Sequence, residues 1–303
     1  MKKLLLIDAN SLIHRAFHAL PPMTAPDGSP SQAVYGVARI LLKLWREEKP
    51  DYAAALFDRP EPTFRDELYK EYKGNRPETA DELISQLIEI HNLFPLFGIK
   101  VFEKPGYEAD DLIATLAKKF GEEKETETTI FTGDLDSLQL VNKKVSVRVP
   151  QKGISETTIY NPEAVKERYG LYPESIADYK SLVGDNSDNI KGVPGIGPKT
   201  AAKLLQKYGS LTKLLAAKDD EEVNKKIISH EAQALLAKKL VTLQSDAPLP
   251  IEGLEDLFVS EDEAGLKDYF AGKGFGSLLK QMSDAPKEAP KKEKDPDRQA
   301  SFF

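Results

Sequence analysis

Acidic residues recur in this chain where predicted strands end or predicted helices begin. Asp8 and Asp58 each close a predicted strand, and Asp134 and Asp136 follow another. Five more open a predicted helix or precede a glycine-rich turn: Glu108, Asp110, Asp111, Asp185 and Asp188. Each of them alone is more simply explained as a helix cap or a turn former. Together they predict a cluster at one sheet edge, because packed carboxylates repel one another unless cations lie between them.

The chemistry of such a cluster follows from its oxygen ligands. Carboxylates select hard divalent cations, so we expect Mg²⁺ or Mn²⁺, with two or more ions bound. Two ions about 4 Å apart can activate a water and stabilise the leaving oxygen of a phosphodiester. The chain has 4 His and no Cys, and we find no Ser-His-Asp or Cys-His arrangement that would compete. The pattern therefore predicts metal-dependent hydrolysis of nucleic acid.

The elements that must position these acids alternate along the first half of the chain. Short apolar runs predict strands at residues 4–8, 52–57, 99–102, 128–131 and 145–149. Helical spacing of apolar residues predicts helices at residues 11–20 (capped by Asn10 or Ser11), 32–47, 81–97 and 107–120. This alternation predicts a doubly wound, mostly parallel α/β sheet, which binds ligands beyond the carboxyl ends of its strands.

Residues 63–80 are polar, mixed in charge and without an apolar stripe, so we expect them to be exposed and mobile. They include Arg65, Lys73 and Arg76, with aromatic residues such as Tyr72 between them. Aromatic rings can stack on single-stranded bases while cations contact phosphates. The alternative is a solvated helix of mixed charge, because acidic residues dilute the basic ones.

After residue 161, short helices and glycine-containing turns replace the strands. In the densest turn, Gly192, Gly195 and Gly197 allow a backbone to approach a phosphate closely. Pro198 suits the first position of a helix, whose free N–H groups would point at that phosphate. Lys199, Thr200 and Lys203 follow on the same helix. An ordinary turn between two helices is the alternative.

Composition excludes several classes of protein. The chain has 303 residues, of which 40% are hydrophobic, and no apolar run approaches the roughly 20 residues that span a bilayer. The absence of cysteine excludes disulfides and thiolate metal sites, and fits a reducing cytoplasm. The net charge of -7 does not exclude DNA binding, because bound metal ions neutralise acidic ligands and the location of the cations matters more.

Several motifs together resemble the 5′-nuclease (flap endonuclease) domain of bacterial DNA polymerase I. They occur in the order and spacing of that family between residues 3 and 282: Leu6–Ser11, Gln32–Gly36, Phe57-Asp58, Tyr72-Lys73, Gly106–Asp111, Thr132–Asp136, Gly184–Asn189 and Gly192–Thr200. The resemblance implies a PIN-like nuclease core over residues 1–160 with a helical arch at about 62–80. It also implies a helical subdomain over 161–283 with a helix–three-turn–helix DNA-binding element, and activity on 5′ flaps, nicks and RNA primers.

The resemblance also implies residue roles. All nine acidic residues named above fall on the family's metal-site acids, and Lys73 and Arg76 fall on basic arch residues that contact the scissile phosphate. Gly192–Thr200 falls on an element that also binds a monovalent ion, so potassium is an expected cofactor. Two residues depart from the family pattern: His14 stands where many members have a tyrosine that stacks near the 5′ nucleotide, and Leu135 stands where a Lys or Arg usually separates the paired aspartates.

The C-terminal residues carry a separate hypothesis. Residues 284–298 are rich in Pro and Lys with almost no apolar residues, so we expect disorder there. The last five residues resemble the bacterial sliding-clamp-binding motif through Gln299, Ser301, Phe302 and Phe303, although Phe302 replaces the usual Leu. The alternatives are an arbitrary tail or the start of a linker to polymerase domains.

Three functions remain open from the sequence. The complete set of acids favours a catalytic 5′ nuclease over a module that binds branched DNA without cutting it or recruits partners. The glycine-rich element argues against a single-strand ribonuclease on a related fold. We expect a monomer that acts on branched or nicked duplex DNA. The sequence leaves open whether the chain is freestanding or part of a polymerase.

Overall fold

The computed structural model describes residues 1–121, 125–151, 156–217 and 222–284. A six-stranded sheet in the order β3-β2-β1-β4-β5-β6 lies at the centre of the first half. Its strands are β1 (Lys2–Asp8), β2 (Tyr52–Phe57), β3 (Lys100–Glu103), β4 (Thr126–Phe131), β5 (Val145–Pro150) and β6 (Thr157–Tyr160). Neighbouring strands pair in parallel except β6, which is antiparallel to β5. The predicted mostly parallel α/β sheet is confirmed.

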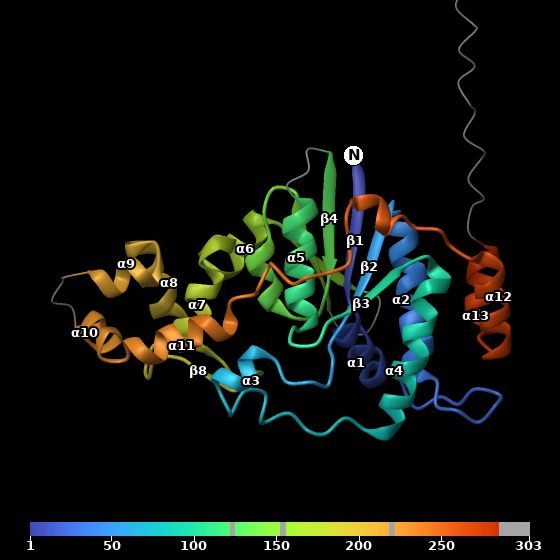
Figure 1. Ribbon diagram of the computed structural model, residues 1–303, viewed down its shortest axis with the longest axis horizontal. Helices are drawn as coiled ribbons and strands as arrows, with labels where there is room; N and C mark the ends of the chain where they lie inside the picture. Colours follow the sequence, from blue (N-terminus) through green and yellow to red (C-terminus); the bar gives the residue numbers. More distant parts are fainter. Residues whose placement is uncertain (122–124, 152–155, 218–221, 285–303) are drawn as a thin grey trace, which may run out of the picture.

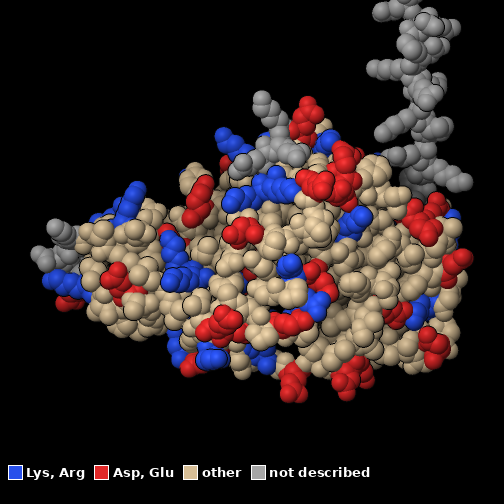
Figure 2. Space-filling view, in the orientation of Figure 1, with Lys and Arg blue, Asp and Glu red and all other residues tan. Residues whose placement is uncertain are grey.

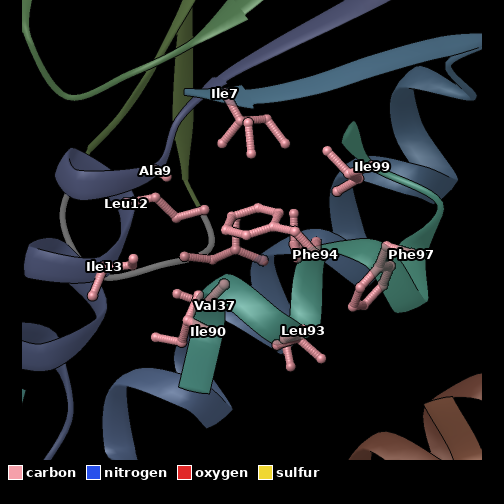
Figure 3. Packing of buried hydrophobic residues seen from close by; sticks show 14 of the residues in the cluster. Ile7, Ala9, Leu12, Ile13, Val37, Ile90, Leu93, Phe94, Phe97 and Ile99 are labelled. Atoms are coloured by element: carbon pink, nitrogen blue, oxygen red, sulfur yellow. The ribbon is translucent and has the colours of Figure 1, made fainter. Parts of the chain in front are cut away.

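Helices cover both faces of this sheet because its central strands are apolar on both sides. Leu5 and Ile7 of β1 pack against α1 (Ala9–Ala19), α2 (Gln32–Glu48) and α4 (Asp81–Leu93). Figure 3 shows this layer, in which the Phe94 ring lies below Ile7 and beside Leu12. Leu4 and Leu6 point the other way, toward α5 (Ala109–Gly121) and α6 (Pro162–Tyr169). Figure 1 shows the two helical layers on opposite sides of β1 and β2.

Helix α1 begins earlier than predicted. Its N-cap is Asp8, whose carboxylate accepts a hydrogen bond from the Ser11 N–H, so neither Asn10 nor Ser11 is the cap. Asp8 is therefore a helix cap, which is the simpler explanation for a single aspartate. The same carboxylate also lies at the end of β1, so capping α1 does not prevent Asp8 from belonging to a site at this sheet edge.

Residues 62–80 are fully described and contain one helix, α3 (Phe64–Leu68), followed by turns. The expectation that this segment is exposed is wrong for two of its residues, Arg65 and Tyr72. Arg65 is 1% exposed, and Tyr72 packs with Ile190, Ala237 and Leu240 in a small apolar cluster. A buried arginine and a buried tyrosine, rather than an apolar stripe, attach this segment to the rest of the protein.

A helical subdomain extends from one side of the sheet (Figure 1). It contains α7 (Ile176–Val183), α8 (Pro198–Tyr208), α9 (Leu211–Ala216), α10 (Glu222–Ser229) and α11 (Glu231–Val241), with the hairpin β7 (Gly184–Asp185) and β8 (Ile190–Lys191) after α7. A separate apolar core that includes Leu182, Val193 and Leu204 holds these helices together. This subdomain corresponds to the helical second half expected from the sequence.

The end of the described chain returns to the first half. Helices α12 (Glu263–Gly272) and α13 (Gly276–Ser283) place Leu266, Phe270 and Leu278 in the same core as α2 and α4. Helices α12 and α13 therefore pack with the first half of the chain, whereas the sequence analysis assigned them to the helical subdomain of residues 161–283. Four 3₁₀ helices complete the described elements: η1 (Phe94–Phe97), η2 (Leu135–Leu140), η3 (Pro173–Ser175) and η4 (Leu254–Leu257).

The described helices are all too short or too polar to cross a lipid bilayer. The predictions for residues 284–303, including the clamp-binding motif Gln299, Ser301, Phe302 and Phe303, lie outside the described residues apart from Asp284.

Candidate metal and nucleic-acid site

A cavity of about 870 Å³ opens at the carboxyl ends of the central strands. Because β1, β2 and β4 are parallel, the residues that follow them meet at one sheet edge. Helix α5 points its first turn into the same cavity. Six of the nine predicted acids line it: Asp8, Asp58, Glu108, Asp110, Asp134 and Asp185. The fold thus brings together acids that are up to 177 residues apart in the chain (185 − 8).

Backbone geometry fixes the orientation of these side chains. Asp8 is 5% exposed and accepts hydrogen bonds from the Ser11 N–H at 3.0 Å and the Thr132 hydroxyl at 2.7 Å. Asp58 accepts from the Ala109 N–H at 2.7 Å, at the start of α5. Asp134 caps η2 by accepting from the Asp136 N–H at 2.8 Å. Each carboxylate is held by a backbone N–H in the first turn of a helix: α1 for Asp8, α5 for Asp58 and η2 for Asp134.

The clustering makes ionisation of these acids unfavourable. Burial raises the pKa of Asp110 well above its usual value, and the charges of Asp134, Asp8 and Asp58 raise it further. Burial and the neighbouring Asp58 raise the pKa of Asp8 to about 7. Burial likewise raises the pKa of Glu108 and of Asp134. The cavity therefore concentrates negative charge that water does not fully solvate.

Basic side chains at the rim offset part of this charge. Lys73 Nζ lies 2.8 Å from Glu108 Oε1, and Arg76 Nη2 lies 2.5 Å from Asp188 Oδ1. Burial by itself would lower the pKa of Lys73, but Glu108 and Asp188 outweigh it and the pKa is raised. Lys73 and Arg76 therefore stand as cations where the 62–80 segment meets the cavity.

Lys180 on α7 is a site residue that the sequence analysis missed. Its ammonium group contacts Asp136 and lies 2.6 Å from Asp185 Oδ2. Burial opposes ionisation of Asp185, yet Lys180 outweighs that effect and lowers the pKa of Asp185 to about 2. Nothing in the sequence distinguishes Lys180 from a surface lysine, because its contacts depend on how α7 packs against η2.

The oxygen ligands of the cavity suit divalent cations, but their side chains are not yet arranged as a coordination shell. Within the described residues, no three Asp, Glu or His side chains converge closely enough to hold an ion as they stand. Lys73, Arg76 and Lys180 lie among the carboxylates instead. The donors are all oxygen, largely buried and mutually repulsive, which is the chemistry that hard divalent cations relieve.

Two predicted site residues, Arg65 and Asp111, are not in the cavity. Asp111 is 0% exposed and forms a two-pronged ion pair with Arg65 at 2.7 and 2.8 Å. Asp111, predicted as a metal ligand, and Arg65, predicted as a DNA contact, are therefore paired with each other outside the cavity. Tyr72 is likewise buried, with 6% of its surface exposed. Its hydroxyl lies at hydrogen-bond distance from two acceptors, Glu108 Oε2 at 3.0 Å and Asp188 Oδ2 at 3.1 Å. Its ring is not free to stack on a base.

The two departures from the family pattern both line the cavity. His14 is exposed on α1, with its ring stacked 6.4 Å from that of His18. Leu135 lines the wall and packs against the core beneath α5. An imidazole and an aliphatic side chain therefore line the cavity at the two positions where the resemblance implies a tyrosine and a basic residue.

The glycine-rich turn joins β8 to α8, and its three glycines have different roles. A side chain at Gly192 would collide with the backbone of Val183 and Gly184, so Gly192 is needed for packing within the protein. Gly195 has a φ of 71°, a conformation that favours glycine. A Cβ at Gly197 would meet nothing within 4 Å. Gly197 therefore borders open space.

Helix α8 continues from this turn with Gly197 as N-cap and Pro198 in its first turn. Lys199 and Lys203 are exposed and Thr200 is half-buried. Figure 2 shows basic and acidic side chains interspersed over one face of the molecule, without a continuous basic surface.

The fold, the acidic cavity and the helical subdomain together indicate a nuclease, and the comparisons show its family. Residues 3–170 match the 5′-3′ exonuclease N-terminal resolvase-like domain, and residues 171–264 match the 5′-3′ exonuclease C-terminal SAM fold. The chain belongs to the 5′-3′ exonuclease family.

Among individual relatives, DNA polymerase I of Bacillus subtilis is 43% identical over 293 residues, which cover 95% of this chain and 33% of that protein. The chain thus spans about a third of the length of this curated relative. The T5 D15 protein co-crystallised with metal ions has the same fold, with a TM-score of 0.68 at 20% identity over 79% of this chain and 89% of that one. The catalytic core of Rad2 in complex with DNA substrate gives 0.58 at 17% identity, over 93% and 91%.

Proposed function

We propose that this chain is a structure-specific 5′ nuclease, with 5′-3′ exonuclease and 5′-flap endonuclease activity on flapped, nicked or RNA-primed duplex DNA. The observation that carries the proposal is the shared cavity of six carboxylates with Lys73 and Arg76 at its rim. Membership of the 5′-3′ exonuclease family supports the same reaction.

Eight of the nine predicted acids would hold two or more Mg²⁺ or Mn²⁺ ions: Asp8, Asp58, Glu108, Asp110, Asp134, Asp136, Asp185 and Asp188. When bound, the ions supply a nucleophilic water at neutral pH and stabilise the leaving oxygen. The T5 D15 protein with its metal ions supports this cofactor class. Lys180 would give up its contacts with Asp136 and Asp185 to the ions, since one ammonium cannot neutralise so many carboxylates.

The protein's own cations would position the substrate. Lys73 and Arg76 would bind the scissile phosphate and offset its charge as it enters the cavity. The exposed ring of His14 would stack against the terminal 5′ base. These three side chains line one cavity, which supports a single path for a 5′ strand.

The duplex would lie on the helical subdomain. Gly197, with open space above it, and the free N–H groups at the start of α8 would approach one phosphate, beside Lys199 and Lys203. Rad2 in complex with its DNA substrate supports DNA binding on this fold. The same turn would also take a potassium ion, as the family resemblance implies.

Cleavage of a 5′-flap duplex in Mg²⁺, Mn²⁺, Ca²⁺ and chelator tests the proposal. We expect cleavage in Mg²⁺ or Mn²⁺ and none in chelator. Asp136→Asn should lower the rate severely and preserve most of the DNA affinity, whereas the exposed Asp246→Asn should match the wild type. Tight binding of the flap without cleavage in any metal would instead support the alternative, a module that binds branched DNA without cutting it.

The C-terminal residues carry a second, independent proposal. Gln299, Ser301, Phe302 and Phe303 would bind a sliding clamp, and the preceding residues would act as a tether that raises the local enzyme concentration. The chain would act as a monomer in the cytoplasm. A protein without cysteine has no disulfides that this reducing compartment would break.

A further inference from the structure

Arg65 and Asp111 form a buried pair beside the cavity rather than in it. The guanidinium Nη1 lies 2.7 Å from Asp111 Oδ2, and Nη2 lies 2.8 Å from Asp111 Oδ1. The two residues are 1% and 0% exposed. This parallel, two-pronged geometry is the strongest form of an arginine–carboxylate contact.

The remaining donors of Arg65 reach a third part of the chain. Its Nε donates to the Leu240 carbonyl at 2.8 Å, and Nη2 donates to the Thr242 carbonyl at 3.3 Å, both at the end of α11. Arg65 itself belongs to α3 at the start of the 62–80 segment. One guanidinium thus fastens that segment to α5 and to the helical subdomain.

The Asp111 carboxylate is saturated by protein donors. Oδ1 accepts from the Gln244 N–H at 2.9 Å, and Oδ2 accepts from the Glu108 N–H at 3.2 Å, in addition to the two contacts with Arg65. Coordinating an ion would require Asp111 to release a buried guanidinium, which would then be left without its charge partner.

We propose that Arg65 and Asp111 are positioning residues that orient the metal-binding turn at the start of α5, and that neither contacts metal or DNA. The proposal rests on the function proposed above. The connection is short: Asp111 holds the Glu108 backbone, and the Glu108 carboxylate pairs with Lys73. Asp110, the neighbour of Asp111, then faces the cavity.

The test compares Arg65→Lys, Asp111→Asn and the double variant carrying both. Lysine keeps the charge of Arg65 but cannot make the two-pronged contact. We expect each single variant to weaken Mn²⁺ binding, measured by calorimetry, by about 10-fold, as for partners of metal ligands generally. Single-turnover flap cleavage should fall by about 10- to 100-fold, because a displacement of about 1 Å has that effect. The double variant should be no worse than either single one, since both disrupt the same contact.

Affinity for flap DNA in chelator separates this role from a direct one. It should stay within about 2-fold of wild type, with the same dependence on salt, in all three variants. A weaker affinity for Arg65→Lys, or a salt slope reduced by about 1, would show that Arg65 contacts a phosphate and would overturn the proposal. A loss of Mn²⁺ binding in Asp111→Asn that Arg65→Lys does not share would make Asp111 a ligand and would also overturn it.

Two controls make the outcome decisive. Arg59→Lys alters a half-buried arginine of the same region, paired with Glu61 and Glu103, and should change none of these quantities. If a variant fails to fold, Arg65→Met combined with Asp111→Leu replaces the pair by apolar side chains and should fold with the same catalytic defect. Folded variants that bind Mn²⁺ and cut like wild type would reduce the pair to a purely structural role and refute the proposal. Wild-type protein that binds Mn²⁺ without cutting would instead refute the proposed function, and the metal-binding comparison would still stand.

Discussion

Replacing Asp8 by Asn should stabilise the metal-free protein while it impairs the proposed reaction. Asp8 is buried at the end of β1, and its pKa rises from 3.8 to about 7 through burial and the nearby Asp58. Keeping this carboxylate ionised near neutral pH therefore costs on the order of 4 kcal/mol of folding free energy. Asparagine removes the charge and still caps α1, because its carbonyl oxygen can accept from the Ser11 N–H.

The pH dependence of this effect has a defined sign. Between pH 3.8 and about 7, folded protein holds the Asp8 proton more tightly than unfolded chain does. The unfolding free energy of the metal-free wild type should therefore fall as pH rises through this window. Asp8→Asn lacks this titration, so the two proteins should be similar near pH 4 and differ most near pH 8. Allowing for solvent relaxation around the carboxylate, we expect a gain of at least about 1 kcal/mol at pH 8.

Denaturant unfolding in chelator, at pH 4 and at pH 8, measures this difference. Magnesium should stabilise the wild type more than the variant, because the ions bind the folded state through the carboxylate that the variant lacks. Asp246→Asn, at an exposed position, should show no such gain at pH 8. An Asp8→Asn protein no more stable than wild type at pH 8 in chelator would refute the account of the cavity as a site of unrelieved repulsion.

The remaining predictions concern the proposed contacts with substrate DNA and with a sliding clamp. Lys73→Ala should lower the single-turnover rate of flap cleavage by about 100-fold, whereas the exposed Lys70→Ala should not; an unchanged rate would remove Lys73 from the reaction. Lys199→Ala and Lys203→Ala should each weaken binding to any duplex sequence and reduce the salt slope by about 1; titrations at several salt concentrations would check this, and an unchanged slope would contradict it. Deleting residues 299–303 should abolish binding to a sliding clamp and leave flap cleavage intact, and persistence of clamp binding would refute the tail hypothesis.

Local patterns were sufficient for much of the fold. The apolar run of β2 (Tyr52–Phe57) was predicted with its observed bounds, and α2 ends one residue later than predicted. Both are buried elements whose apolar residues follow the period of the structure they form. The carboxyl-end rule for parallel sheets then predicted where Asp8 and Asp58 would lie, and both line the cavity.

Local patterns failed where burial uses polar side chains. The 62–80 segment has no apolar stripe, yet Arg65 and Tyr72 anchor it through contacts with residues 46 and 116 positions away. Lys180 could not be predicted for a related reason: its carboxylate partners, Asp136 and Asp185, belong to other elements, η2 and β7. Such pairings are set by how distant elements pack, which no window of neighbouring residues records.

The sequence by itself determined the class of the protein, through its order of elements and its set of acids near strand ends and helix starts. Only the tertiary structure decided which acids share the cavity. Asp110 and Asp111 are adjacent, and successive residues on a helix point about 100° apart, so both cannot face the same way. Contacts of α5 with the 62–80 segment and with Gln244, which follows α11, accompany the turn of Asp110 toward the cavity and of Asp111 toward Arg65. That choice depends on the three-dimensional position of a guanidinium that lies 46 residues away in the chain.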